Sequence, residues 1–527
     1  SCWLKYAVLS RTTHRGLVSA TRRATVAGVI APKNVIEEPL DDVSTSTGVS
    51  AGTTTTSSVP DAAAPTTRSS VECSQDPATG CMASPALVVM SHDRVDMLKR
   101  SLGQVCKLQL ADRFTVYISE DSGKAALKEA AKGFGCVAEV LSFKHHAATE
   151  PFESTGLYKI STHFRFALEA TLTKRGHSHV IILEDDLLLA PDILLFFWSV
   201  AWLLESDPTL WCASAWNDQG FPHLVSSPER LSRTDYFPGL GWMITANIWA
   251  ELRRSWPRRA TTGWDHWMRL STTARGRECV HPEINRSRHA SSRGTNVVNN
   301  KPFERFSFET KGVSSFGDVS YLLRSTFEPA IEQLVRTATL RVPPLTDGLR
   351  WLDSLPLDSP TLVLYVREQY RALAKNLGLW GENPRATHNG TISLRTHVGA
   401  TLILADQRRC PYLSEQQRMR PSADGNFVAA AAGLSCSDAC AKSGRYCTDA
   451  ELEWANSCEE LRRHFGCEAG CGHQVGAELP AYASSPLLDT YQQCLVSDIA
   501  FSKCDAKFIK TSRLCRCVSQ KPARALL

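Results

Sequence analysis

The stretch His179-Val180-Ile181-Ile182-Leu183-Glu184-Asp185-Asp186 decides the fold of this chain. An apolar run leads directly into three acids. A continuous apolar run of this length predicts a strand that is buried on both faces of a sheet. The three acids then follow at the carboxyl end of the strand, which is where open α/β sheets bind their ligands.

Three adjacent carboxylates repel one another unless a cation shares their site. Oxygen ligands suit Mg²⁺ or Mn²⁺, so a divalent ion that carries a phosphorylated ligand is the natural partner of such a triplet. Taken alone, the triplet is more simply an acidic turn between a strand and a helix. The surrounding sequence favours the ligand site.

Length and charge limit the classes of protein that this chain can be. Its 527 residues predict two or three domains. The formal net charge is only +5 and no block of Lys and Arg stands out, so nucleic acid is not an expected partner, whereas an anionic substrate is compatible with the charge.

The cysteine content indicates an oxidising compartment. The chain has 18 cysteines, and the glycosylation sequons at Asn285 and Asn389 fit the same compartment. No apolar run reaches the roughly 18–20 residues of a membrane helix. Because the first residue is Ser rather than Met, we expect any signal or membrane anchor to lie upstream of the sequence or to be missing from it.

Composition divides the chain into four segments. Residues 1–80 are predicted to be a disordered Ser/Thr-rich stem, because this composition cannot form a core. Residues 81–300 are predicted to be a first folded domain, residues 301–408 a second, smaller folded part, and residues 409–527 a cysteine-rich module.

Alternating strands and helices fill the second segment. Strands are predicted over residues 86–90, 115–119, 179–183 and 210–216, with helices over 94–105, 124–132 and 156–174. This alternation predicts an α/β fold with a Rossmann-like, mostly parallel sheet. Asp121 follows the second of these strands, so we expect it to face the same crevice as Glu184 to Asp186. Dinucleotide, P-loop and Gly-x-Ser-x-Gly patterns are absent, which disfavours the corresponding enzyme classes.

Residues 216–270 are rich in tryptophan, glycine and charge. Aromatic faces beside carboxylates are typical of sugar recognition, although packed loop aromatics have the same composition. Asp265 lies between Trp264 and His266. An apolar setting of this kind raises the pKa of a carboxyl and suits a general base, so we expect a raised pKa for Asp265.

Several motifs in one order resemble the N-acetylglucosaminyltransferase I family, which includes the protein O-mannose enzyme. They are Ile182-Leu183-Glu184-Asp185-Asp186-Leu187, Leu210-Trp211-Cys212-Ala213-Ser214-Ala215-Trp216-Asn217-Asp218, Arg233-Thr234-Asp235-Tyr236-Phe237-Pro238-Gly239-Leu240-Gly241-Trp242, Trp264-Asp265-His266-Trp267-Met268-Arg269 and Arg275-Gly276-Arg277-Glu278-Cys279. The resemblance covers about residues 84 to 405 and is strongest through 156–285. It implies a nucleotide-sugar glycosyltransferase fold of the GT-A type, with residues 81–300 as the catalytic nucleotide-sugar-binding domain and residues 301–408 as the smaller C-terminal part of the transferase.

The resemblance also implies a reaction, which is inverting transfer of GlcNAc from UDP-GlcNAc to a mannose hydroxyl of a glycoprotein. Asp186 would be the only protein ligand of Mn²⁺, with Mg²⁺ the weaker alternative, and Asp265 would be the general base. The residues implied to bind substrate are Arg94, Asp121, His163, Glu184, Asp185, Trp264 and Asn296. Without the resemblance, Arg94 and Asp121 read as surface charges and His163 as a core histidine.

The chain departs from the family pattern at a few positions. His266 and Asn296 stand where the N-glycan enzyme carries Asp and Ser, and His92 and Ser122 stand where it carries an early disulfide. Cys212 and Cys279 match a pair that is bridged in the family.

The cysteine-rich end lacks paired Cys-x₂-Cys knuckles, so disulfides are expected there rather than zinc. Ten cysteines between residues 436 and 517 allow five bridges and leave Cys410 over. The tract also resembles the cysteine-rich end of N-acetylglucosaminyltransferase V, and a small stapled binding or stabilising module is the interpretation.

Three functions stay open at this point. The main hypothesis is a Golgi-lumenal, type II membrane-anchored enzyme that forms a β-1,2 linkage to initiate an N-glycan branch. The same chemistry on O-linked mannose is the second hypothesis. A catalytically inactive glycan-binding protein is the third, and the presence of both Asp186 and Asp265 argues against it.

Overall fold

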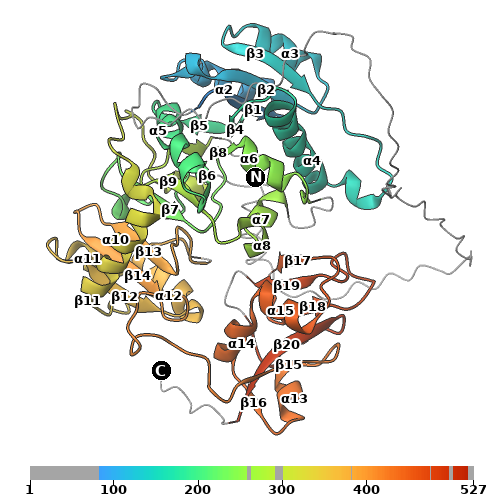
Figure 1. Cartoon of the computed structure of the whole chain (residues 1–527), viewed down its shortest axis with the longest axis vertical. Coiled ribbons are helices and arrows are strands. Elements are labelled where there is room, and N and C mark those ends of the chain that lie inside the picture. The colour runs from blue at the N-terminus through green and yellow to red at the C-terminus, as the bar shows by residue number, and fades with distance from the viewer. Residues whose placement is uncertain are drawn as a thin grey trace, which may run out of the picture. The chain divides into compact units, whose positions relative to one another are not determined.

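The computed structural model describes residues 82–257, 263–290, 301–381, 383–474, 476–497 and 502–519 (Figure 1). The predicted stem over residues 1–80 and the candidate residue Asn296 lie outside the described residues. No helix of the described ranges is both long and apolar enough to cross a bilayer.

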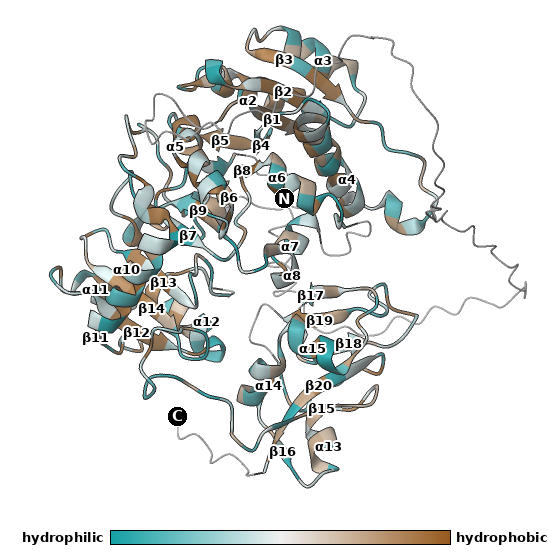
Figure 2. Ribbon diagram, viewed as in Figure 1, coloured by the Kyte–Doolittle hydropathy of each residue, from teal (hydrophilic) through white to brown (hydrophobic). Residues whose placement is uncertain are grey.

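The catalytic part is organised around one eight-stranded sheet with the order β3-β2-β1-β4-β8-β6-β9-β7. Its strands are β1 (Pro85–Ser91), β2 (Thr115–Glu120), β3 (Val137–Ser142), β4 (His179–Glu184), β6 (Leu210–Ser214), β7 (Leu231–Thr234), β8 (Trp242–Thr245) and β9 (Glu278–Pro282). Figure 1 shows β3, β2, β1 and β4 side by side. Figure 2 colours the strands of this sheet mostly as hydrophobic, as a sheet covered on both faces requires.

Strand β4 has the burial that its sequence predicts, since His179 to Leu183 are all buried. It pairs in parallel with β1, with Glu184 opposite Met90, and β1 pairs in parallel with β2. The fold is therefore α/β with a mostly parallel sheet, as predicted. Four strands of the sheet were not foreseen: β3 pairs in parallel with β2, β9 pairs in parallel with β6, β8 lies antiparallel between β4 and β6, and β7 lies antiparallel to β9.

Helices cover this sheet. They are α2 (Val95–Val105), α3 (Ala125–Lys132), α4 (Gly156–Leu168), α5 (Ile193–Ser206), α6 (Ala246–Leu252), α7 (Trp264–Met268) and α8 (Ser271–Ala274). The helix predicted over 156–174 is wrong at its end, because residues Glu169–Thr173 form a π-helix instead. The hydroxyl of Thr171 donates to the carbonyl oxygen of Ala167 at 2.8 Å, and such side-chain bonds compete with the regular helical ladder.

A smaller sheet follows, with the order β11-β12-β14-β13. Its strands are β11 (Thr339–Leu340), β12 (Thr361–Tyr365), β13 (Thr391–Arg395) and β14 (Thr401–Asp406), and nearby helices are α9 (Lys301–Glu304), α10 (Arg324–Thr337), α11 (Gly348–Asp353) and α12 (Arg367–Leu377). Strands β13 and β14 form an antiparallel hairpin. A two-stranded sheet pairs β5 (Leu187–Leu189) with β10 (Ser287–His289).

The sequon at Asn285 is not a glycan acceptor in the folded chain. Asn285 is fully buried, its side-chain oxygen accepts from the Asn217 backbone N–H at 2.6 Å, and its amide donates to the carbonyl of Ser307 at 3.0 Å. The prediction for this position was wrong because a three-residue pattern carries no information on burial.

The cysteine-rich end forms a sheet of its own from β15 (Asn426–Ala429), β16 (Tyr446–Cys447), β17 (Cys471–Gln474), β18 (Ala481–Ala483), β19 (Cys494–Ser497) and β20 (Thr511–Val518), with helices α13 (Cys436–Ala441), α14 (Asp449–Ala455) and α15 (Cys458–His464). Five disulfides staple it: Cys436–Cys515, Cys440–Cys517, Cys447–Cys504, Cys458–Cys471 and Cys467–Cys494. The predicted disulfide-rich module is thus confirmed, and Cys410 is buried and free.

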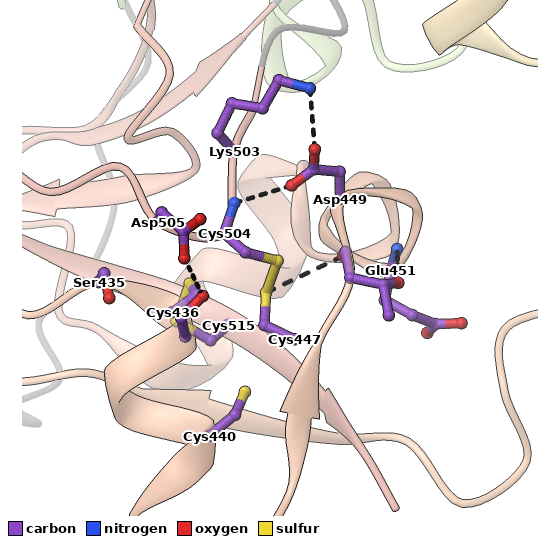
Figure 3. Close-up of a disulfide and its surroundings, with 12 residues drawn as sticks. Ser435, Cys436, Cys440, Cys447, Asp449, Glu451, Lys503, Cys504, Asp505 and Cys515 are labelled. Carbon is purple, nitrogen blue, oxygen red and sulfur yellow. Dashed lines mark hydrogen bonds and ion pairs between the residues drawn. A yellow bond between two sulfur atoms is a disulfide. The ribbon is translucent and has the colours of Figure 1, made fainter. Parts of the chain in front are cut away.

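Figure 3 shows how the Cys447–Cys504 bridge is held in place. The carboxylate of Asp449 accepts from the backbone N–H of Cys504 at 2.8 Å and pairs with the ammonium of Lys503 at 2.8 Å. Asp449 is the first residue of α14, so these contacts tie the start of the helix to the loop before β20 that carries Cys504. Further bridges in the catalytic part join Cys106 to Cys136 and Cys212 to Cys279.

Arg233 supplies a stability prediction. Its guanidinium is 1% exposed and bonds to Glu278 at 2.7 Å and to Asp207 at 2.9 Å. We expect Arg233→Met to lower the free energy of unfolding by about 3–5 kcal/mol, because two buried carboxylates lose their cation. Chemical denaturation measures the change. The exposed Arg371→Met is the control, and an equal effect of both variants would contradict the prediction.

Candidate active site

A cavity of about 550 Å³ opens at the carboxyl edge of β1, β2 and β4. Six of the predicted site residues line it together: Arg94, Asp121, His163, Glu184, Asp185 and Asp186. The parallel register places the ends of these strands at one edge, and α4 contributes His163 and Phe164. The two acidic strand ends therefore share one crevice.

Arg94 balances the charge of the acidic triplet. Its guanidinium donates to Asp185 Oδ1 at 2.5 Å and to Asp186 Oδ2 at 3.2 Å. The hydroxyl of Ser91 donates to the other oxygen of Asp185 at 2.7 Å. Burial raises the pKa of Asp185 to about 6, although Arg94 opposes that shift. Both oxygens of Asp185 are thus occupied by protein donors.

Asp186 differs from Asp185 because one of its carboxylate oxygens has no hydrogen-bond partner among the described residues. Its Oδ1 is buried and accepts no hydrogen bond from the described residues. His289 Nδ1 lies 3.6 Å from that oxygen, beyond hydrogen-bonding distance. Burial alone would raise the pKa of Asp186, but His289 and Arg94 hold it well below its usual range. A buried, ionised and unshared carboxylate oxygen fits a divalent cation held mainly by a diphosphate and water.

No group of three or more His, Cys, Asp or Glu side chains within the described ranges is arranged to hold a metal alone. His289 was missed by the sequence analysis. It reaches Asp186 because β10 pairs with β5, which places His289 opposite Leu187. Nothing local in the sequence signals this long-range register.

Asp121 lies at the centre of a histidine cluster. His92 Nδ1 is 2.6 Å from its Oδ1, and His145 Nε2 and His163 Nδ1 are 2.8 Å and 3.5 Å from its Oδ2. Burial lowers the pKa of His163 to about 4, despite the opposing charge of Asp121. His145 was not predicted, and His92 was noted only as a replacement for a family cysteine.

This cluster gives a second prediction. If the cavity binds UDP, as the family resemblance implies, we expect His145→Ala to weaken that binding by roughly tenfold, because Asp121 loses a donor that fixes its carboxylate. Isothermal titration with UDP measures the affinity. His146→Ala is the matched control, since His146 is 58% exposed and contacts Tyr158 instead. Equal affinities of the His145 variant and the wild type would show that Asp121 needs no such support.

Asp265 lies on α7, buried at 5% exposure. Its Oδ2 accepts from Arg269 at 2.8 Å, one turn further along, and its Oδ1 accepts no hydrogen bond from the described residues. The expected rise in its pKa is wrong. Burial does act in that direction, but the charges of Arg269 and His266 outweigh it and lower the pKa of Asp265. The carboxylate is therefore ionised, and its Oδ1 can accept a hydrogen bond or a proton from a hydroxyl group.

Trp264 lies behind the cavity rather than on its surface. Its ring centroid is 4.3 Å from that of Phe164, which lines the cavity, and 5.4 Å from that of Trp242. The tryptophans of residues 216–270 are mostly core residues, as Trp216, Trp242, Trp249 and Trp256 are all buried. Trp264 thus reaches the cavity through the ring of Phe164.

The GNT-I family model matches residues 58–410, which is most of the chain. The chain belongs to the GNT-I family. A curated relative, the alpha-1,3-mannosyl-glycoprotein 2-beta-N-acetylglucosaminyltransferase of Arabidopsis thaliana, is 30% identical over 337 residues, covering 62% of this chain and 74% of the relative. The GNT-I match ends at Cys410, so the five disulfides of the cysteine-rich module lie beyond it.

Among solved structures, a mannosyltransferase from Pyrobaculum calidifontis in complex with GDP-Man and Mn²⁺ is 16% identical. The similarity covers 53% of this chain and 71% of that one, with a TM-score of 0.27. An overlap of that extent supports no inference about the site of this GNT-I family member.

Proposed function

We propose that this chain is an inverting glycosyltransferase that moves GlcNAc from UDP-GlcNAc to a mannose hydroxyl of a glycoprotein glycan. The linkage would be β-1,2, and the acceptor an N-glycan at the stage of branch initiation. The observation that carries the proposal is the single cavity lined by six nucleotide-site candidates in a GNT-I family chain. The name of the Arabidopsis thaliana relative supports the choice of sugar and acceptor.

The proposed roles are those that the family resemblance implies, and the positions of the residues in the cavity support them. His163 and Asp121 would bind the uridine, because they lie at the end of the cavity formed by β2 and α4. Arg94 would move away from Asp185 and Asp186 and would itself neutralise phosphate oxygens, a task for which a guanidinium is well suited. Glu184 and Asp185 would accept hydrogen bonds from the hydroxyls of the transferred sugar.

Asp265 would act as the general base. Attack by the acceptor hydroxyl on the anomeric carbon forms the new glycosidic bond while the bond to UDP breaks, and the hydroxyl proton passes to Asp265 Oδ1. The neighbouring guanidinium of Arg269 holds the other oxygen and so orients the carboxylate. The lowered pKa of Asp265 keeps its carboxylate ionised at neutral pH, although it also makes this carboxylate a weaker base than a neutral histidine.

We further propose that Mn²⁺, or less favourably Mg²⁺, is bound through Asp186 Oδ1, the unshared oxygen of the triplet. Such an ion supplies charge to neutralise the departing diphosphate. Asn296, outside the described residues, remains a candidate contact to that diphosphate. The expected site of action is the Golgi lumen.

The test is transfer from labelled UDP-GlcNAc in the presence of Mn²⁺ or EDTA, with two acceptors side by side. One acceptor is a five-mannose N-glycan and the other an O-mannosyl peptide. Mn²⁺-dependent labelling of the N-glycan supports the proposal, and labelling of only the peptide transfers the activity to the O-mannose class. Binding of UDP without labelling of either acceptor would favour a catalytically inactive glycan-binding protein.

A further inference from the structure

A second cavity, of about 420 Å³, is built by three parts of the chain. The catalytic part supplies Arg269 and Ser271, the smaller sheet supplies Tyr365 and Arg409, and the cysteine-rich module supplies His473 and Ser497. None of its lining residues lines the first cavity. Its volume lies within the range of small-molecule sites.

Helix α7 stands between the two cavities. At one end of the helix, Trp264 packs on Phe164 of the first cavity. At the other end, Arg269 lines the second cavity while its Nη1 donates to Asp265 at 2.8 Å. Four helical residues span only about 6 Å, so the second cavity opens within a short distance of the proposed base.

The lining of the second cavity combines acids, cations and aromatic rings. Asp235 and Asp406 are the acids, and Tyr236 and Tyr365 are the rings. Arg409 is exposed to this space, and within the described residues its guanidinium makes no hydrogen bond or ion pair. Arg277 and Arg367 also line the cavity, and repulsion from Arg367 lowers the pKa of Arg409.

This mixture favours a neutral polyhydroxylated ligand. Sugar hydroxyls bond both to carboxylates and to guanidinium groups, and the C–H faces of a sugar pack on aromatic rings. Arg409 in particular offers donors that no acceptor among the described residues uses.

The wall supplied by the cysteine-rich module is held rigidly. Asn456 and Ser497 exchange two hydrogen bonds, at 2.8 and 2.9 Å, and the bridges Cys458–Cys471 and Cys467–Cys494 enclose the same segment. An ion pair of 3.2 Å between Arg367 and Glu453 joins this module to the smaller sheet. A wall that is preorganised in this way loses little entropy when it binds a ligand.

We infer that this cavity is a saccharide subsite for the acceptor, and that the cysteine-rich module forms one of its walls. It binds mannose units of the acceptor glycan beyond the one that reacts. The inference rests on the proposed function, which places the acceptor beside Asp265. It also assigns a role in acceptor selection to a module that lies outside the GNT-I match.

The test uses the full chain with Arg409→Gln and Ser271→Trp, the first removing donors and the second filling the cavity. Arg371→Gln and Thr272→Trp are matched controls, because both residues are exposed and neither lines the cavity. We expect the ratio of kcat/KM for a five-mannose glycan to that for methyl mannoside to fall about tenfold or more in both cavity variants. The controls keep the wild-type ratio, and circular dichroism verifies folding.

Direct binding separates this inference from the proposed function. Calorimetric titration of the same glycan, with UDP present, should give a signal for the wild type that both cavity variants weaken by a similar factor. Glycan binding that both cavity variants weaken, in a chain that transfers nothing, would support the subsite and remove the enzymatic proposal. An unchanged ratio and unchanged affinity in both folded variants, or no glycan binding by the wild type, would overturn the inference.

Discussion

Asp265→Asn is expected to lower kcat for GlcNAc transfer by about 10²–10⁴, which is the usual contribution of a positioned general base. The amide is nearly the same size as the carboxylate and still accepts a hydrogen bond from Arg269, whose Nη1 lies 2.8 Å from Asp265 Oδ2. It cannot take up the proton of the acceptor hydroxyl. Single-turnover transfer from labelled UDP-GlcNAc measures the rate.

UDP binding provides the internal check on this variant. Asp265 does not line the first cavity, so we expect the affinity for UDP to stay within about twofold of the wild type. The exposed Asp353→Asn serves as a control for the change of charge. A parallel loss of transfer and UDP binding would mean that Asp265 supports the structure through its pair with Arg269 rather than acting as the base.

The sequence predicts those parts of the fold whose signals are local. Strand β4 and helix α2 were predicted because an apolar run and a helical pattern each lie within a dozen residues. Strand β8 was not, because its four residues follow Gly239, Leu240 and Gly241, which all have positive φ, in a stretch that reads as a loop. Its pairing with β4 is a tertiary contact that no local pattern encodes.

The residues of the candidate site also fall into those with a local sequence signal and those without one. Asp186 and Asp121 end predicted strands, so the topology of a parallel sheet is enough to bring them to one edge. His145 and His289 lie in segments without a recognisable pattern and reach the site through long-range contacts. The pKa of Asp265 was predicted in the wrong direction because Trp264 is its neighbour in the sequence, whereas the ion pair with Arg269 is a contact of the folded chain.

Asp186→Ala is expected to remove metal-dependent UDP binding, raising the Kd for UDP in Mn²⁺ by roughly 100-fold or more, as loss of a charged ligand or its supporting shell does. The physical reason is that Asp186 Oδ1 is a buried carboxylate oxygen that accepts no hydrogen bond from the described residues. Its lowered pKa also means that binding a cation requires no release of a proton from it. Electron paramagnetic resonance of Mn²⁺ titrated into protein and UDP measures bound metal without relying on turnover.

The contrast with Asp185→Ala makes this prediction specific. Both oxygens of Asp185 are occupied, by Ser91 and Arg94, so its removal should weaken UDP binding to a similar extent with Mn²⁺ and with EDTA. Removal of Asp186 should instead leave UDP binding in EDTA nearly unchanged, since the metal-independent contacts remain. If the two variants respond alike to EDTA, or if the Asp186 variant still binds Mn²⁺ in the presence of UDP, the metal is held elsewhere and the assignment of Asp186 fails.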